Sequence, residues 1–95
     1  MAGVEMLTIF TYDITDDRRR RRAARILEGT LVRVQESVFE GRLTRSGARQ
    51  LIGAVEAALD RDDSLRVYAV AADGLDRCHQ RGGAPIMTDE DYWLL

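Results

Sequence analysis

The stretch Met6–Arg22 reads MLTIFTYDITDDRRRRR and carries the strongest structural signals in the chain. Its first part, Met6–Tyr12, is rich in β-branched and aromatic residues and predicts a central β-strand that stops at Asp13. The arginines Arg18–Arg22 follow within one loop. A carboxylate at a strand end, next to guanidinium groups, combines a ligand for a hard cation with donors for phosphate oxygens. The junction therefore predicts a phosphate-handling site.

The residues after this strand predict a helix that ends near Gly29. Either Asp16 or Asp17 can cap its N-terminus, where negative charge is favoured. Five adjacent arginines cannot all lie on one side of a helix, so they must divide between different surroundings. The apolar stripe expected to face the sheet consists of Ala23, Ile26 and Leu27. The outer face, a predicted surface for nucleic acid, carries Arg18, Arg22 and Arg25.

The rest of the chain continues this alternation of elements. Residues 31–43 predict two strands or one bent ribbon, because their alternation changes near Glu36 and Ser37. Thr44 is a candidate N-cap for a second helix, and residues 65–71 predict a further strand. Apolar residues repeat at helical spacing in the second helix, at Ala48, Leu51, Ile52, Val55 and Leu59. The order is that of a ferredoxin-like α+β fold, a βαββαβ sandwich with an antiparallel sheet.

The length of 95 residues fits one small domain. We expect residues 1–71 to form the ferredoxin-like domain and residues 72–95 to form a tail, because the tail contains several glycines and the only proline, Pro85. The tail ends in the apolar stretch Tyr92–Leu95, which is expected to dock on its own domain or to add an edge strand to a partner's sheet. A domain of this size buries a modest core, which favours a homo-oligomer.

Charge is distributed unevenly along the chain. Residues 1–50 contain ten arginines and seven acidic residues, a net charge of +3, whereas residues 51–95 have a net charge of −5. A polyanion should therefore meet the N-terminal half. All 14 basic residues are arginine, which suits contacts with the phosphate backbone. A GC-rich genome would also replace lysine throughout, but that explanation does not account for the cluster Arg18–Arg22.

Cysteine content and hydropathy predict a cytoplasmic protein. The single cysteine, Cys78, excludes an internal disulfide framework and fits a reducing compartment. One cysteine and the one histidine, His79, cannot complete a zinc site. The apolar run at residues 6–10 is too short to cross a bilayer, and no signal-peptide pattern precedes it. No membrane association is expected.

Five strings of residues together resemble the CRISPR-associated protein two family. They are Tyr12–Ile14, Asp16–Arg22, Ile26–Gly29, Arg33–Gln35 and Ser37–Gly41. The resemblance keeps their order and spacing over residues 6–71, so it is far more specific than any single motif. It implies a ferredoxin-like homodimer that joins the CRISPR integrase in spacer acquisition, a part of antiviral defence. It also implies endonuclease activity on RNA or double-stranded DNA that depends on Mg²⁺, with Mn²⁺ as the alternative ion.

The resemblance also assigns roles to individual residues. The metal-site aspartate of the family falls on Asp13, with Tyr12 beside it as the other catalytic candidate. One aspartate supplies too few ligands for a divalent cation. A metal site would therefore need a two-fold dimer that brings two copies of Asp13 together. Positions that the family ties to activity or to nucleic-acid contact fall on Arg20, Arg22, Arg33, Ser37 and Phe39. Glu36 departs from the family, where a basic or aromatic residue is common.

Each candidate also has a plainer interpretation. Asp13 could accept backbone hydrogen bonds in the turn after the strand. The arginine run could be a solvated helix face, and Phe39 could fill the core or a dimer interface rather than stack on a base. An alternative function for the whole chain is that of a toxin-type ribonuclease of the same fold.

Overall fold

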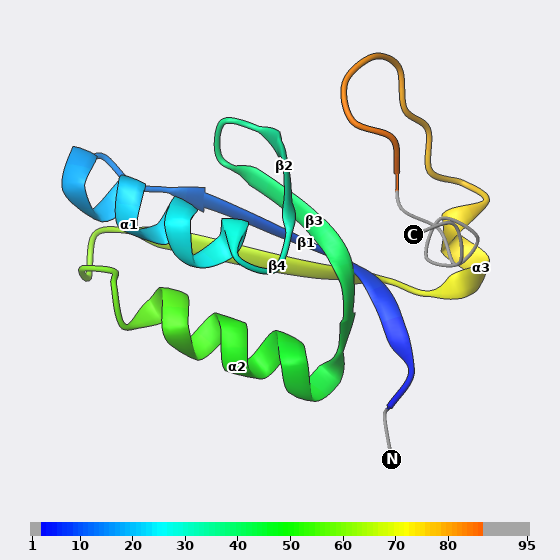
Figure 1. Cartoon of the computed structure of the whole chain (residues 1–95), viewed down its shortest axis with the longest axis horizontal. Coiled ribbons are helices and arrows are strands. Elements are labelled where there is room, and N and C mark those ends of the chain that lie inside the picture. Colours follow the sequence, from blue (N-terminus) through cyan, green and yellow to red (C-terminus); the bar gives the residue numbers. More distant parts are fainter. Residues whose placement is uncertain (1–2, 87–95) are drawn as a thin grey trace.

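The computed structural model describes residues 3–86. In chain order its elements are β1 (Glu5–Asp13), α1 (Asp17–Glu28), β2 (Val32–Gln35), β3 (Val38–Thr44), α2 (Arg45–Glu56), β4 (Ser64–Val70) and α3 (Ala72–Leu75). The predicted βαββαβ order and the ferredoxin-like α+β class are therefore confirmed (Figure 1). Within this part of the chain, no helix has the length and apolar content needed to cross a membrane.

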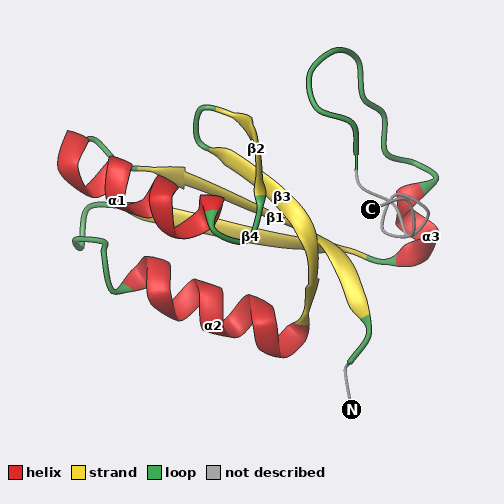
Figure 2. Ribbon diagram, viewed as in Figure 1, coloured by secondary structure: helices red, strands yellow, loops and turns green. Residues whose placement is uncertain are grey.

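The four strands form one antiparallel sheet in the order β2-β3-β1-β4, with β1 in an interior position (Figure 2). In this register Phe10 lies opposite Phe39 of β3, and Asp13 lies opposite Ser64 of β4. Residues 31–43 form two strands rather than one bent ribbon. A tight turn at residues 36–37 joins them, and β2 has an irregular register between Arg33 and Gln35.

The core lies between the sheet and the two long helices, which run side by side on one face (Figure 1). Phe10 and Phe39 are fully buried there. They lie opposite each other in the β1–β3 register, and alternate residues of each strand point to the same side of the sheet, so both rings face the helices. The helices contribute Ala23, Ala24 and Leu27 from α1 and Leu51 and Val55 from α2. Leu59, expected within the second helix, lies after its end at Glu56 but still packs against the core.

Side-chain caps fix where both helices begin. Asp16 accepts a hydrogen bond of 2.9 Å from the backbone N–H of Arg19, which holds the pKa of the Asp16 carboxyl below its usual value. The choice left open between Asp16 and Asp17 is therefore decided, because Asp17 is the first helical residue. Thr44 caps α2 as predicted and accepts from the backbone N–H of Gly47 at 3.0 Å. These caps satisfy backbone donors that a helix leaves without intrahelical partners.

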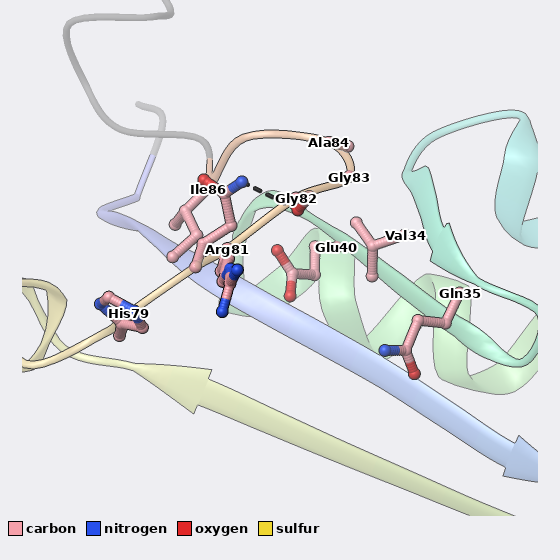
Figure 3. A pocket seen from close by; sticks show the side chains of 10 residues that line it. Val34, Gln35, Glu40, His79, Arg81, Gly82, Gly83, Ala84 and Ile86 are labelled. Carbon is pink, nitrogen blue, oxygen red and sulfur yellow. Dashed lines mark hydrogen bonds between the residues drawn. The ribbon is translucent and has the colours of Figure 1, made fainter.

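The described part of the tail consists of α3 and an irregular segment that reaches Ile86. The predicted docking of Tyr92–Leu95 lies outside the described residues. Segment 79–86 crosses the sheet on the side of Glu40, and together they line a cavity of about 260 Å³ (Figure 3). This side is the one opposite the helices, because Glu40 alternates with the buried Phe39 along β3.

An ion pair joins the start of α1 to the loop before β4. Arg19 Nε donates to Asp63 at 2.8 Å and Arg19 Nη2 donates to the same carboxylate at 3.3 Å. The side chain of Asp63 is only 1% exposed and also accepts from the backbone N–H of Asp60. The hydrogen bond from Arg19 is the main reason why the pKa of Asp63 is lowered from 3.8. This pair ties the start of α1 to the loop that precedes β4.

We predict that Arg19→Gln lowers the thermal midpoint by several degrees, because it leaves the buried Asp63 carboxylate without its charged partner. A depressed pKa stabilises the fold above the ordinary value of 3.8, and this stabilisation is lost as the pH falls through the lowered pKa. The difference between wild type and variant should therefore shrink at acid pH. Arg18→Gln is the matched control, since Arg18 is exposed and forms no ion pair within residues 3–86. Equal midpoints at neutral pH for Arg19→Gln and wild type would contradict this role.

Candidate functional site at the end of strand β1

Four of the predicted site residues gather around one small cavity at the end of β1. The cavity has a volume of about 210 Å³, and its predicted members are Tyr12, Asp13, Arg20 and Ser37. Ile14 and Glu36 complete its lining. Asp13 is exposed and is the last residue of β1, on the helix-free side of the strand. The cavity thus combines the Asp13 carboxylate at the end of β1, the Arg20 guanidinium from α1 and the Ser37 hydroxyl group from the β2–β3 turn.

Tyr12 holds the turn at residues 36–37 against the end of β1. Its backbone N–H donates to the carbonyl of Ser37 at 3.2 Å, and its hydroxyl group donates to the carbonyl of Glu36 at 3.4 Å. The side chain is buried, and burial raises the pKa of the phenol, although the Arg33 guanidinium acts in the opposite direction. Tyr12 therefore remains a neutral hydrogen-bond donor, and its contacts support the shape of the site.

Arg20 braces the loop that follows Asp13. Its Nη1 atom donates to the carbonyls of Ile14 and Thr15, both at 3.2 Å, and its Nη2 atom forms an ion pair with Asp17. The carbonyls of an irregular loop need such donors when helix or sheet bonds are missing. Arg20 thus uses much of its hydrogen-bonding capacity inside the protein, although it lines the cavity.

Arg33 likewise donates hydrogen bonds within the protein, at the β2–β3 turn. Its Nε and Nη2 atoms donate to the carbonyl of Glu36 at 3.0 and 2.6 Å, and its Nη1 atom donates to Glu28 at 3.1 Å. The guanidinium also lies over the ring of Phe39, 5.3 Å from the ring centroid. Phe39 is fully buried and stacks against Tyr12 at 6.1 Å. The ring therefore has a packing role in this structure and offers no free face to a base.

A second cavity, which we call the arginine groove, lies between α1 and the β2–β3 turn. It has a volume of about 350 Å³ and is lined by Arg20, Arg21, Ala24, Arg25, Glu28, Arg33 and Glu36. Arg20 and Glu36 also line the Asp13 cavity, so the two cavities are neighbours. The predicted outer stripe is thus divided: Arg25 lines the groove, whereas Arg18 and Arg22 are exposed and line neither of these two cavities.

Three features of the structure were missed by the reasoning from sequence. Arg21 lines the groove, and its position one helical turn before Arg25 was a signal that could have identified it. The ion pair between Arg19 and Asp63 had no such signal, because its residues are 44 positions apart and belong to different elements. Glu36 was noted as a departure from the family and at the change of alternation, but not as a site residue, yet it lines both cavities.

One chain does not supply a full set of ligands for a divalent cation at this site. Among residues 3–86 no group of three His, Cys, Asp or Glu side chains could hold a metal ion. The Asp13 cavity also contains the Arg20 guanidinium, whose positive charge disfavours a nearby cation. The residues of a single chain therefore do not fit the magnesium site implied by the family.

The model of the family described as CRISPR associated protein Cas2 matches residues 6–78. The chain belongs to the Cas2 family. A family member named CRISPR-associated endoribonuclease Cas2, from Thermus thermophilus, is 38% identical over 91 residues, which cover 93% of this chain and 97% of that protein. A Cas2 protein with the same name from Mycobacterium tuberculosis is 38% identical over 66 residues, covering 70% of this chain and 58% of that protein.

Solved Cas2 structures share the fold. The crystal structure of Streptococcus pyogenes Cas2 at pH 6.5 has a TM-score of 0.69 and 26% identity, covering 81% of this chain and all of that one. A chain from a partial Cas6-RT-Cas1–Cas2 complex has a TM-score of 0.70 and 27% identity, covering 87% of this chain and 92% of that one. The family predicted from five short strings is thus confirmed over most of the chain.

A separate prediction concerns Glu40, which lies beneath segment 79–86 on the helix-free side of the sheet (Figure 3). Burial raises the pKa of the Glu40 carboxyl above 4.5. A raised pKa contributes stability that is complete below 4.5 and is lost as the pH rises through the raised value. Glu40→Gln should therefore make the protein more stable than wild type at about pH 7 but not below about pH 4.

Urea unfolding at both pH values measures this effect. Glu56→Gln is the control, because Glu56 is an exposed glutamate at the end of α2 and should leave the free energy of unfolding almost unchanged at either pH. A Glu40→Gln protein that is less stable than wild type at neutral pH would show that the ionised carboxylate makes a favourable contact.

Proposed function

We propose that this protein is a nucleic-acid-binding component of CRISPR spacer acquisition, acting as a homodimer together with the CRISPR integrase. The observation that carries the proposal is the arginine groove next to the Asp13 cavity in a chain of the Cas2 family. The similar chain in a Cas1–Cas2 complex supports the integrase as partner. The net charge of +3 in residues 1–50 supports a polyanionic ligand.

The mode of binding we propose is contact with backbone phosphates and little reading of bases. Arginine guanidinium groups match phosphate oxygens in a forked geometry. The aromatic ring under Arg33, that of Phe39, is buried and cannot stack on a base, whereas sequence-tolerant single-strand binders usually offer exposed rings. These features favour duplex DNA held by its phosphates, with RNA as the alternative ligand.

Dimerisation would use the helix-free side of the sheet. There Tyr68 is 50% exposed and lies beside the half-buried Ile9, with which it pairs in the β1–β4 register. Asp13 lies on the same side of β1, so a two-fold axis near the strand end would bring two copies of Asp13 together. The terminal tail, residues 72–95, would dock on the domain or on a partner.

A second candidate function is metal-dependent cleavage of RNA or double-stranded DNA. It is favoured by the exposed Asp13 carboxylate beside the arginine groove and by relatives whose names describe them as endoribonucleases. Mg²⁺, or Mn²⁺ in its place, would polarise a phosphate and lower the pKa of bound water. Because one chain lacks the ligands, this activity depends on the partner subunit's Asp13, and Tyr12 would contribute by holding the turn.

The binding proposal predicts a steep dependence of affinity on salt. The logarithm of the association constant for duplex DNA should fall linearly with the logarithm of salt concentration, by about 0.9 for each phosphate contact. Fluorescence anisotropy with duplexes of unrelated sequence should give similar affinities. Affinity that does not change with salt, or that differs strongly between sequences, would contradict binding through phosphates.

The cleavage proposal predicts that Asp13→Asn abolishes magnesium-dependent activity, with a loss of at least about 100-fold, because changes in outer-shell residues alone cost 10–100-fold. Binding should persist, since the variant removes a negative charge near the phosphates. Asp62→Asn is the matched control, because Asp62 is an exposed aspartate in the α2–β4 loop. Cleavage by Asp13→Asn at the wild-type rate would place the activity elsewhere, without affecting the binding proposal.

A further inference from the structure

The arginine groove contains two kinds of arginine, which differ in what their guanidinium groups contact. Arg20 donates to loop carbonyls and pairs with Asp17, and Arg33 donates to the Glu36 carbonyl and to Glu28. These two side chains are therefore held in place by the protein itself. Both line the groove.

Arg21 and Arg25 are the other two arginines of the groove. Both are exposed, and neither side chain forms a hydrogen bond or an ion pair within residues 3–86. Of the two acidic residues that line the groove, Glu28 and Glu36, the first is already paired with Arg33 at 3.1 Å. The groove thus presents two guanidinium groups whose donors are available to a ligand.

The positions of these two arginines on α1 suit one shared anion. Residues four apart on a helix have their Cβ atoms about 5–6 Å from each other, and two like charges at this spacing repel. An anion between them relieves the repulsion and receives hydrogen bonds from both sides. Ala24, which lies between them in sequence and is 5% exposed, forms a small and shallow floor that leaves room for a ligand.

The Glu36 side chain determines where along the groove an anion can lie. It has no side-chain partner within the described residues and lines the end of the groove that adjoins the Asp13 cavity. Its negative charge, together with that of Asp13, disfavours a phosphate at this end. The favourable position is therefore above Ala24, between Arg21 and Arg25.

We propose that Arg21 and Arg25 together bind one phosphate of a nucleic-acid backbone, next to the Asp13 cavity. Arg20 and Arg33 act as positioning residues that hold the loop and the turn on either side. The inference rests on the proposed nucleic-acid binding and assigns its strongest phosphate contact to one pair of residues. It adds Arg21 to the binding surface and removes Arg20 and Arg33 from direct contact.

The test is a double-mutant cycle with Arg21→Gln, Arg25→Gln and the combined variant, measured with duplex DNA over a range of salt concentrations. Because one phosphate needs both arginines, each single change should weaken binding about tenfold, and the combined change should weaken it little further. The salt slope should fall by about 0.9, the value for one lost phosphate contact. Two independent losses that add fully would contradict a shared phosphate.

Arg45→Gln combined with Arg49→Gln is the matched control. These residues have the same spacing on α2, are exposed, form no ion pair within residues 3–86 and line a different cavity, beside Gly3 and Val4. This variant removes the same charge and should keep the wild-type slope. Equal losses in both double variants would mean that overall charge, and not the groove, controls binding, which would overturn the inference.

The outcome also separates the inference from the function on which it rests. Wild-type protein that binds no nucleic acid would overturn both. Wild-type protein that binds with a steep salt slope, while the Arg21→Gln and Arg25→Gln variant retains that slope, would overturn only the assignment to the groove. Because both side chains are exposed, the variants should keep the wild-type thermal midpoint, which a melting curve checks.

Discussion

Tyr12 connects the end of β1 to the β2–β3 turn through two hydrogen bonds, from its backbone N–H to Ser37 and from its hydroxyl group to Glu36. The Tyr12 ring stacks on the Phe39 ring. The Arg33 guanidinium lies over the Phe39 ring and donates to the same Glu36 carbonyl. Both candidate cavities have walls in this turn. If the turn moved away from β1, Asp13 would lose its cavity and the arginine groove would lose one side.

The arginines of α1 show how a single run of like charges can take several roles. A helix turns by about 100° per residue, so neighbouring side chains face different surroundings. Arg19 faces the loop before β4 and pairs with Asp63, Arg20 faces the loop after Asp13, and Arg21 faces the groove. The internal pairs hold α1 in place. They leave the remaining guanidinium groups available for an anionic ligand.

The order of the elements, the alternation along β1 and the helix caps at Asp16 and Thr44 could all be predicted, because each depends on residues within a few positions of one another. The family could be recognised for the same reason, since its strings are short and keep their spacing. The division of the arginines was predicted only in part. The five arginines were expected to divide between different surroundings, but the partners of Arg19 and Arg20 could not be named.

The sequence alone determined that this chain forms a βαββαβ sandwich with a carboxylate at the end of β1 and an excess of arginine behind it, since periodicity and composition are local properties. Only the tertiary structure decided which arginine side chains are bonded within the protein and which can bind an anionic ligand. That decision depends on contacts such as the one between Arg19 and Asp63, 44 positions apart, and on the turn that carries Glu36 to the flank of α1. Folding brings these groups together through the pairing of β1 with β3 and β4, and no local pattern records the distances that result.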